Sequence, residues 1–162
     1  MNASHEPASG RQERQQEALA ASRGDRDRAV DAMRTLKATA GQAGPGRDQA
    51  WREAVIAAIA QLQTALAEQQ ASYEDPTSLM TQIARDNPRL RTWVRQLHHR
   101  WSDLAKTTQT LAEALQAEGA ADAWTIPDVR EQLRWLMAAL HHHRAREADL
   151  IFEALDFDIA AS

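Results

Sequence analysis

The sequence predicts an all-α protein, built as an up-down-up-down four-helix bundle. Leucine occurs 15 times against 10 valines and isoleucines together, and 33 alanines accompany them, a mixture that favours helix over sheet. Apolar residues recur with helical spacing in four long stretches that are separated by short breaks rich in glycine or proline. A chain of 162 residues is long enough for one domain. Short turns between four amphipathic helices favour a bundle in which each helix runs antiparallel to the one before it.

The first helix is expected to follow a polar tail. Residues 1–16 have almost nothing to bury and are predicted to be a disordered N-terminal tail or a frayed helix start, which leaves a single bundle domain at 17–159. The helical pattern itself runs from about Arg11 to Ala40. The sequence GQAGPG at 41–46 predicts the end of this helix and a turn. The expected buried stripe of the first helix is Leu19, Arg26, Val30, Met33, Leu36 and Ala40.

The second helix is expected to start at Asp48, as its N-cap, and to end at Asp75-Pro76, because the residue before a proline is disfavoured in the α conformation. Its buried stripe is Trp51, Val55, Ile59, Leu62, Leu66, then Gln69 or Gln70, then Tyr73. A short helical piece at 76–86 follows, and Asn87-Pro88 repeats the same boundary signal.

The third helix shows the most regular pattern, a 4-3 alternation over nearly four heptads that ends at the EGAADAW stretch of 118–124. Its stripe is Leu90, Val94, Leu97, Trp101, Leu104, Thr108, Leu111 and Leu115. Thr125 and Asp128 then flank Pro127 as a capping-box-like start of the fourth helix. The fourth stripe is Val129, Leu133, Leu136, Leu140, His143, Glu147, Ile151 and Ala154.

Composition excludes several function classes. The absence of cysteine excludes disulfides, thiolate metal sites, iron–sulfur clusters and a cysteine nucleophile. A net charge of -4 argues against a general polyanion binder, and the basic residues near the start of the third helix are interpreted as a solvated face. No apolar run is long enough for a membrane span, and residues 1–25 lack the apolar core of an export signal, so the expected location is the cytoplasm.

The fourth helix carries polar residues on its apolar face. At 100° per residue, His143 and Glu147 lie within about 60° of Leu140 and are predicted to face inward together. By the same geometry His98 lies on the flank of the third helix, and His99 faces water.

Glu147 is the most informative of these residues. A buried and unpaired carboxylate costs several kcal/mol or becomes neutral, so Glu147 is expected to meet a metal, a cation or a strong donor. Arg26 is the candidate cation, and Gln69 or Gln70 together with Glu74 would complete an interior polar layer.

Two stretches resemble one family. PRLRTWVRQLHHRWSDL at 88–104 and HRAREADLIFEALDFDI at 143–159 are similar to the third and fourth helices of bacterial hemerythrin-like proteins of the His-His-Glu cation-binding type. The resemblance runs from Arg26 to Ile159. It implies a four-helix bundle around a metal pair, two irons held by histidines and carboxylates and used for dioxygen, peroxide or sensing.

Most ligands that the resemblance implies are missing here. Arg26 or Asp27 stands where the family has its first histidine, and Gln69 or Gln70 replaces the histidine of the second helix. The third-helix histidine falls on Trp101.

The fourth helix keeps His143 and Glu147, and Glu74 is left as the second-helix carboxylate. These three could hold one loosely bound ion, because a di-iron centre needs ligands from all four helices.

Two hypotheses follow. The first is a non-enzymatic bundle with a degenerate metal site and no cofactor, whose interior polar cluster includes Arg26, Gln69, Gln70 and Trp101. It would act in a structural role or through an unidentified protein partner, or as a homodimer through an outer stripe that includes Ile56 and Trp93, and not through nucleic acid or membranes.

The second hypothesis is a residual metal protein. His143, Glu147 and Glu74 would bind one iron, manganese or zinc ion with an open position, for oxygen, peroxide or redox sensing.

Overall fold

The structure, a computed structural model, describes residues 8–160, and these form helices with no strand among them, as the all-α prediction requires. None of the helices within 8–160 combines the length and the apolar character needed to cross a membrane. The helices are α1 (Ala8–Gly41), α2 (Asp48–Glu74), α3 (Leu79–Asp86), the 3-10 helix η1 (Pro88–Leu90), α4 (Arg91–Gln116), α5 (Ala120–Ala123) and α6 (Ile126–Ala160).

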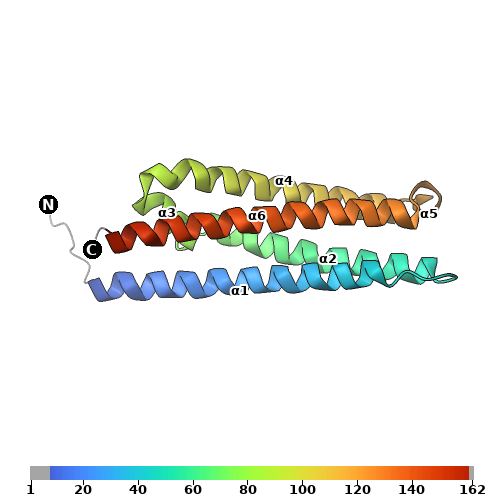
Figure 1. The fold of residues 1–162 in the computed structure, drawn as a ribbon, viewed down its shortest axis with the longest axis horizontal. Helices are drawn as coiled ribbons and strands as arrows, with labels where there is room; N and C mark the ends of the chain where they lie inside the picture. Colours follow the sequence, from blue (N-terminus) through green and yellow to red (C-terminus); the bar gives the residue numbers. More distant parts are fainter. Residues whose placement is uncertain (1–7, 161–162) are drawn as a thin grey trace.

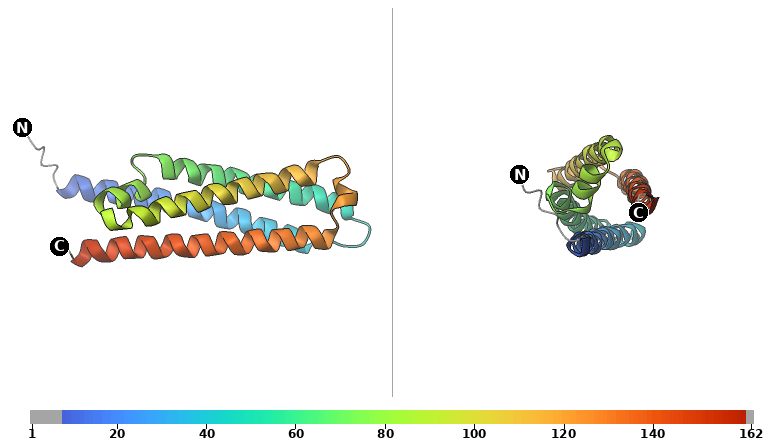
Figure 2. Two further views of the ribbon diagram at one scale, coloured as in Figure 1. Left: turned by 90° about the horizontal axis from the view of Figure 1, so that it is seen from above. Right: turned by 90° about the vertical axis from the view of Figure 1, so that its left-hand side faces the viewer.

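Four long helices build the molecule, and the three short ones lie in their connections (Figure 1). α1 packs against α2 and α6, α2 also packs against α4, and α4 against α6, so the four surround one core (Figure 2). Each long helix runs opposite to the one before it (Figure 1). With 26 to 35 residues each, they are about 40–50 Å long. The beginning of α1, the end of α6 and α3 therefore meet at the same end of the molecule.

Local signals explain most of the helix boundaries. The Thr125 backbone N–H donates to Asp128 Oδ2 at 2.9 Å, and the Asp128 N–H donates to Thr125 Oγ1 at 3.3 Å, which confirms the capping box at the start of α6. Gly119 has a φ of +75°, a left-handed conformation that glycine adopts without strain and that separates α4 from α5.

The structure differs from the predicted boundaries at three places. Residues 8–16 belong to α1, so this part of the polar segment is the start of the first helix and not a disordered tail, while residues 1–7 lie outside the described part. Asp48 is the first helical residue of α2 and Arg47 its N-cap. The short helix α3 starts at Leu79, because the Ser78 side chain accepts the Thr81 N–H at 3.2 Å and caps it there.

The core is narrow and continuous along the four long helices. Its largest fully buried side chains include Leu36, Ile59, Leu62, Trp101, Leu140 and Leu150. In the N-terminal part of α1 the buried face differs from the expected stripe by one residue. Ala18, Asp25 and Ala29 are buried, whereas Leu19 and Val30 are partly exposed. Small side chains allow α1 to approach its neighbours closely, so the alanine face is the one that turns inward.

Candidate functional site

A polar layer crosses the core between α2 and α6. Glu147 and His143, one turn apart on α6, are each only 2% exposed, in agreement with the helical-angle prediction. Gln69 of α2 is 3% exposed, and its Nε2 donates to both carboxylate oxygens of Glu147 at 3.3 Å. Of the two candidate glutamines, Gln69 therefore belongs to the layer, whereas Gln70 is partly exposed.

Aromatic side chains enclose His143. Trp101 of α4 is wholly buried, and its Nε1 donates to the Leu66 carbonyl oxygen at 3.0 Å. The Trp101 and His143 rings lie 4.7 Å apart, centroid to centroid. The Tyr73 hydroxyl lies 3.5 Å from His143 Nε2, so Tyr73 joins the site although the sequence pattern marks it only as a core residue.

Burial dominates the electrostatics of this layer. It lowers the pKa of His143 to about 4, with the charges of Arg100 and His142 acting in the same direction, so the imidazole is neutral at pH 7. Burial raises the pKa of Glu147, an effect that the Arg26 charge and hydrogen bonds from Tyr73 and Gln69 partly offset. Burial beside Glu147 also raises the pKa of Tyr73, which keeps its proton.

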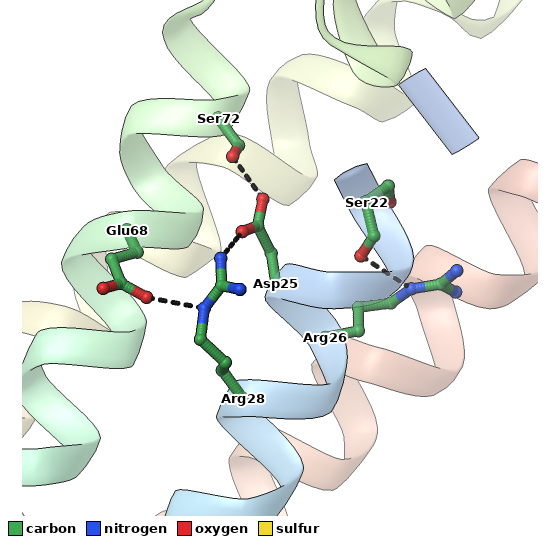
Figure 3. A network of polar contacts seen from close by, with 6 residues as sticks. All are labelled: Ser22, Asp25, Arg26, Arg28, Glu68 and Ser72. Carbon is green, nitrogen blue, oxygen red and sulfur yellow. Dashed lines mark hydrogen bonds and ion pairs between the residues drawn. The ribbon is translucent and has the colours of Figure 1, made fainter. Parts of the chain in front are cut away.

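Arg26 influences Glu147 through its charge without direct pairing. Its Nε donates to the Ser22 carbonyl oxygen at 3.3 Å, and its side chain extends toward α6 (Figure 3). Among the described residues Glu147 has no ion-pair partner within 4.0 Å. The buried carboxylate therefore depends on the Gln69 amide, the Tyr73 hydroxyl and more distant charge.

Asp25 is a second buried carboxylate, which the sequence stripe missed. It accepts hydrogen bonds from Arg28 and from the Ser72 hydroxyl of α2, and Arg28 Nε also donates to Glu68 at 2.8 Å (Figure 3). Asp25 lies seven residues after Ala18 and seven before Ala32, so counting alanine as a core residue would have placed it inward.

The three candidate metal ligands are not brought together. Glu74 is exposed, and its Oε1 lies 3.8 Å from Nε2 of the flanking His98, whose ring stacks on Tyr73. His143 and Glu147 remain in the core without it. Among the described side chains, those of residues 9–156, no three histidine, aspartate or glutamate groups are arranged to share one ion.

A cavity of about 330 Å³ adjoins the polar layer. Gln69, Tyr73 and Glu147 form part of its wall, and α1, α2 and α3 supply the rest. The buried layer is thus reached from the end of the molecule where α1 begins.

On the outer surface, Ile56 and Trp93 are partly buried against the core and partly exposed, and the Arg146 guanidinium lies 5.5 Å from the Trp93 ring. The large apolar side chains that are exposed within the described residues are Trp135 and Phe152, both on α6.

We expect Glu147→Gln to stabilise the protein by about 1 kcal/mol at pH 7. A glutamine amide at 147 can accept from Gln69 Nε2 and donate to Gln69 Oε1, which now has no partner among the described residues. The native state holds the Glu147 proton more tightly than the unfolded chain, so wild-type stability falls as pH rises above the ordinary pKa of 4.5. Glutamine at 147 does not ionise, so the variant does not lose stability from this residue as pH rises.

The measurement is urea unfolding at pH 4 and pH 7, with the exposed Glu153→Gln as the matched control. The gain for Glu147→Gln should be larger at pH 7 than at pH 4. A marked destabilisation at pH 7 would show that Glu147 is held by a stronger partner than Gln69.

Compared with protein-family models, curated proteins and solved structures, the chain matches none of them.

Proposed function

We propose that this protein is a hemerythrin-like, up-down-up-down four-helix bundle with a degenerate metal site, and that its role is non-enzymatic. The observation that carries the proposal is Trp101, a wholly buried indole 4.7 Å from the His143 ring and fixed by its bond to the Leu66 carbonyl. In the alignment with hemerythrin-like proteins, a ligand histidine would stand at this position.

The remaining polar residues support the same proposal. Gln69 holds Glu147 with its amide, and a glutamine amide is a much weaker metal ligand than the histidine expected from the resemblance. Glu74 stays at the surface beside His98. A buried polar layer with internal hydrogen bonds can fix the register of four helices, which is a structural rather than a chemical role.

If the role is one of interaction, the partner class that suits this chain is another protein. Trp135 is 57% exposed and Phe152 66% exposed, and exposed aromatic side chains of this kind are common at protein interfaces.

Metal content tests the proposal. Protein made in iron-rich medium is expected to carry far less than one iron, manganese or zinc ion per chain, measured by elemental analysis. Chelator should leave its melting temperature unchanged, because the fold rests on the apolar core.

The matched variant is His143→Gln. The proposal would be overturned if the wild type contained about one metal ion per chain and His143→Gln contained none. That result would support the single-metal protein with an open coordination position.

A further inference from the structure

In the wall of the cavity beside Glu147 lies one buried hydrogen-bond acceptor that has no donor among the described residues. Gln69 lines the cavity, is 3% exposed, and its Oε1 accepts no hydrogen bond from any described residue. Glu147, 2% exposed, also lines it; Gln69 Nε2 donates to it at a long 3.3 Å and the Tyr73 hydroxyl donates as well, and its carboxylate oxygens can accept further hydrogen bonds. Both groups accept hydrogen bonds, so the ligand that completes them is a donor, and the carboxylate favours a cation.

The lining residues carry more acidic than basic groups, although Arg28 pairs with Asp25 and the Arg26 charge acts on Glu147. Among its described lining residues are four carboxylates and a single arginine, Arg14. The carboxylates are those of Glu17, Asp25, Asp75 and Glu147. Hydrogen bonds from Thr77 lower the pKa of Asp75, which is therefore ionised at pH 7. An anionic ligand would meet repulsion on most sides of this cavity.

These carboxylates are spread out rather than gathered. No three acidic or histidine groups among the side chains that the structure describes are arranged around one point, so a single metal ion cannot use them together. An extended cation with one positive charge at each end can interact with carboxylates at two separate places in the cavity. Ala18, Ala21, Leu79 and Met80 form apolar parts of the wall, which suit an aliphatic chain between the two charges.

The volume sets the size of the ligand. About 330 Å³ lies at the lower limit of cavities that hold small organic molecules. It accommodates a short chain with amino groups at its ends and excludes a large cofactor.

We propose that this cavity binds a short linear diammonium ion, with one ammonium group donating to Glu147 and Gln69 Oε1 and the other lying near the acidic residues Glu17 and Asp75. The inner ammonium supplies the hydrogen bond that Gln69 Oε1 lacks. The outer ammonium lies near exposed carboxylates and contributes less, because water screens them. Binding of this kind goes beyond the proposed structural role and does not depend on whether a metal binds elsewhere.

The experiment titrates the full chain with 1,4-diaminobutane at pH 7, by calorimetry and by the shift of the melting temperature. Three comparison compounds separate the features of the ligand: butylamine has one charge, 1,4-butanediol has the same length without charge, and Mg²⁺ has the charge without the chain. We expect the diamine to bind about two- to fivefold more tightly than butylamine. The diol and Mg²⁺ should give no saturable signal.

Variants locate the site. Glu147→Gln, which should fold at least as well as the wild type, is expected to weaken binding of both amines at least about tenfold, while the exposed Glu153→Gln leaves it unchanged. Glu17→Gln should remove the preference for the diamine over butylamine and leave butylamine binding as it was. Ala18→Leu, which places a larger side chain in the cavity, should abolish binding of both.

Three results would overturn the proposal. The first is the absence of saturable diamine binding up to about 10 mM, a concentration beyond that of a weak millimolar site. The second is equal affinity in the wild type and Glu147→Gln. The third is an equal effect of Mg²⁺, which would indicate general screening of an acidic surface or a metal site.

Discussion

Trp101→Ala is expected to lower the free energy of unfolding by about 3–5 kcal/mol. Trp101 is wholly buried and packs against the His143 and Tyr73 rings, so its removal leaves a cavity in the middle of the core. The variant also leaves the buried Leu66 carbonyl without its indole donor at 3.0 Å. Urea unfolding followed by circular dichroism measures the loss.

The same substitution elsewhere provides the control. Trp135, on α6, is 57% exposed, so Trp135→Ala should cost less than about 1 kcal/mol. Similar losses for the two variants would contradict the central position of Trp101, and with it the main support for the proposed function. Trp101→His, which introduces the histidine that the proposed hemerythrin-like resemblance implies here, should not gain a metal ion, because Gln69 stands where the same resemblance implies a further histidine.

The second large effect is a loss of stability in mild acid that originates at His143. Burial lowers its pKa from 6.5 to about 4, so between these values the unfolded chain binds a proton that the native state does not. Stability from this residue is therefore complete above about pH 6.5 and is lost as pH falls to about 4, by up to about 3 kcal/mol.

His143→Gln tests this effect, because its side-chain amide keeps a polar atom near the Tyr73 hydroxyl while removing the titratable group. The free energy of unfolding should fall less between pH 7 and pH 4 in this variant than in the wild type. Glu147 acts with the opposite sign in acid, but it is present in both proteins and cancels in the comparison. The exposed His141→Gln should follow the wild-type curve, and parallel curves for all three would contradict a buried neutral His143.

The sequence alone determined the helical class, most breaks between helices and the inward side of α6. These features follow from local rules: proline and glycine stop helices, Thr125 and Asp128 form a cap, and a 100° rotation per residue puts His143 and Glu147 on one face. The same rotation placed His99 at the surface and His98 at the flank. On α4 and α6 the large apolar residues were numerous enough to identify which face of each helix is buried.

Only the tertiary structure decided what the polar residues meet. The α1 sequence has few large apolar residues, so its rotation depends on close packing of alanines, and Asp25 rather than Arg26 is buried. Gln69 and Gln70 differ by 100° around α2, and the sequence did not decide which of them faces inward. The contact of Gln69 with Glu147 on α6 decides it. Glu74, the last residue of α2, lies at the surface, and the cavity is formed where residues of α1, α2 and α3 meet beside the buried layer. Periodicity specifies how one helix is oriented to a core, whereas contacts between helices depend on their relative rotation and distance, which no single helix encodes.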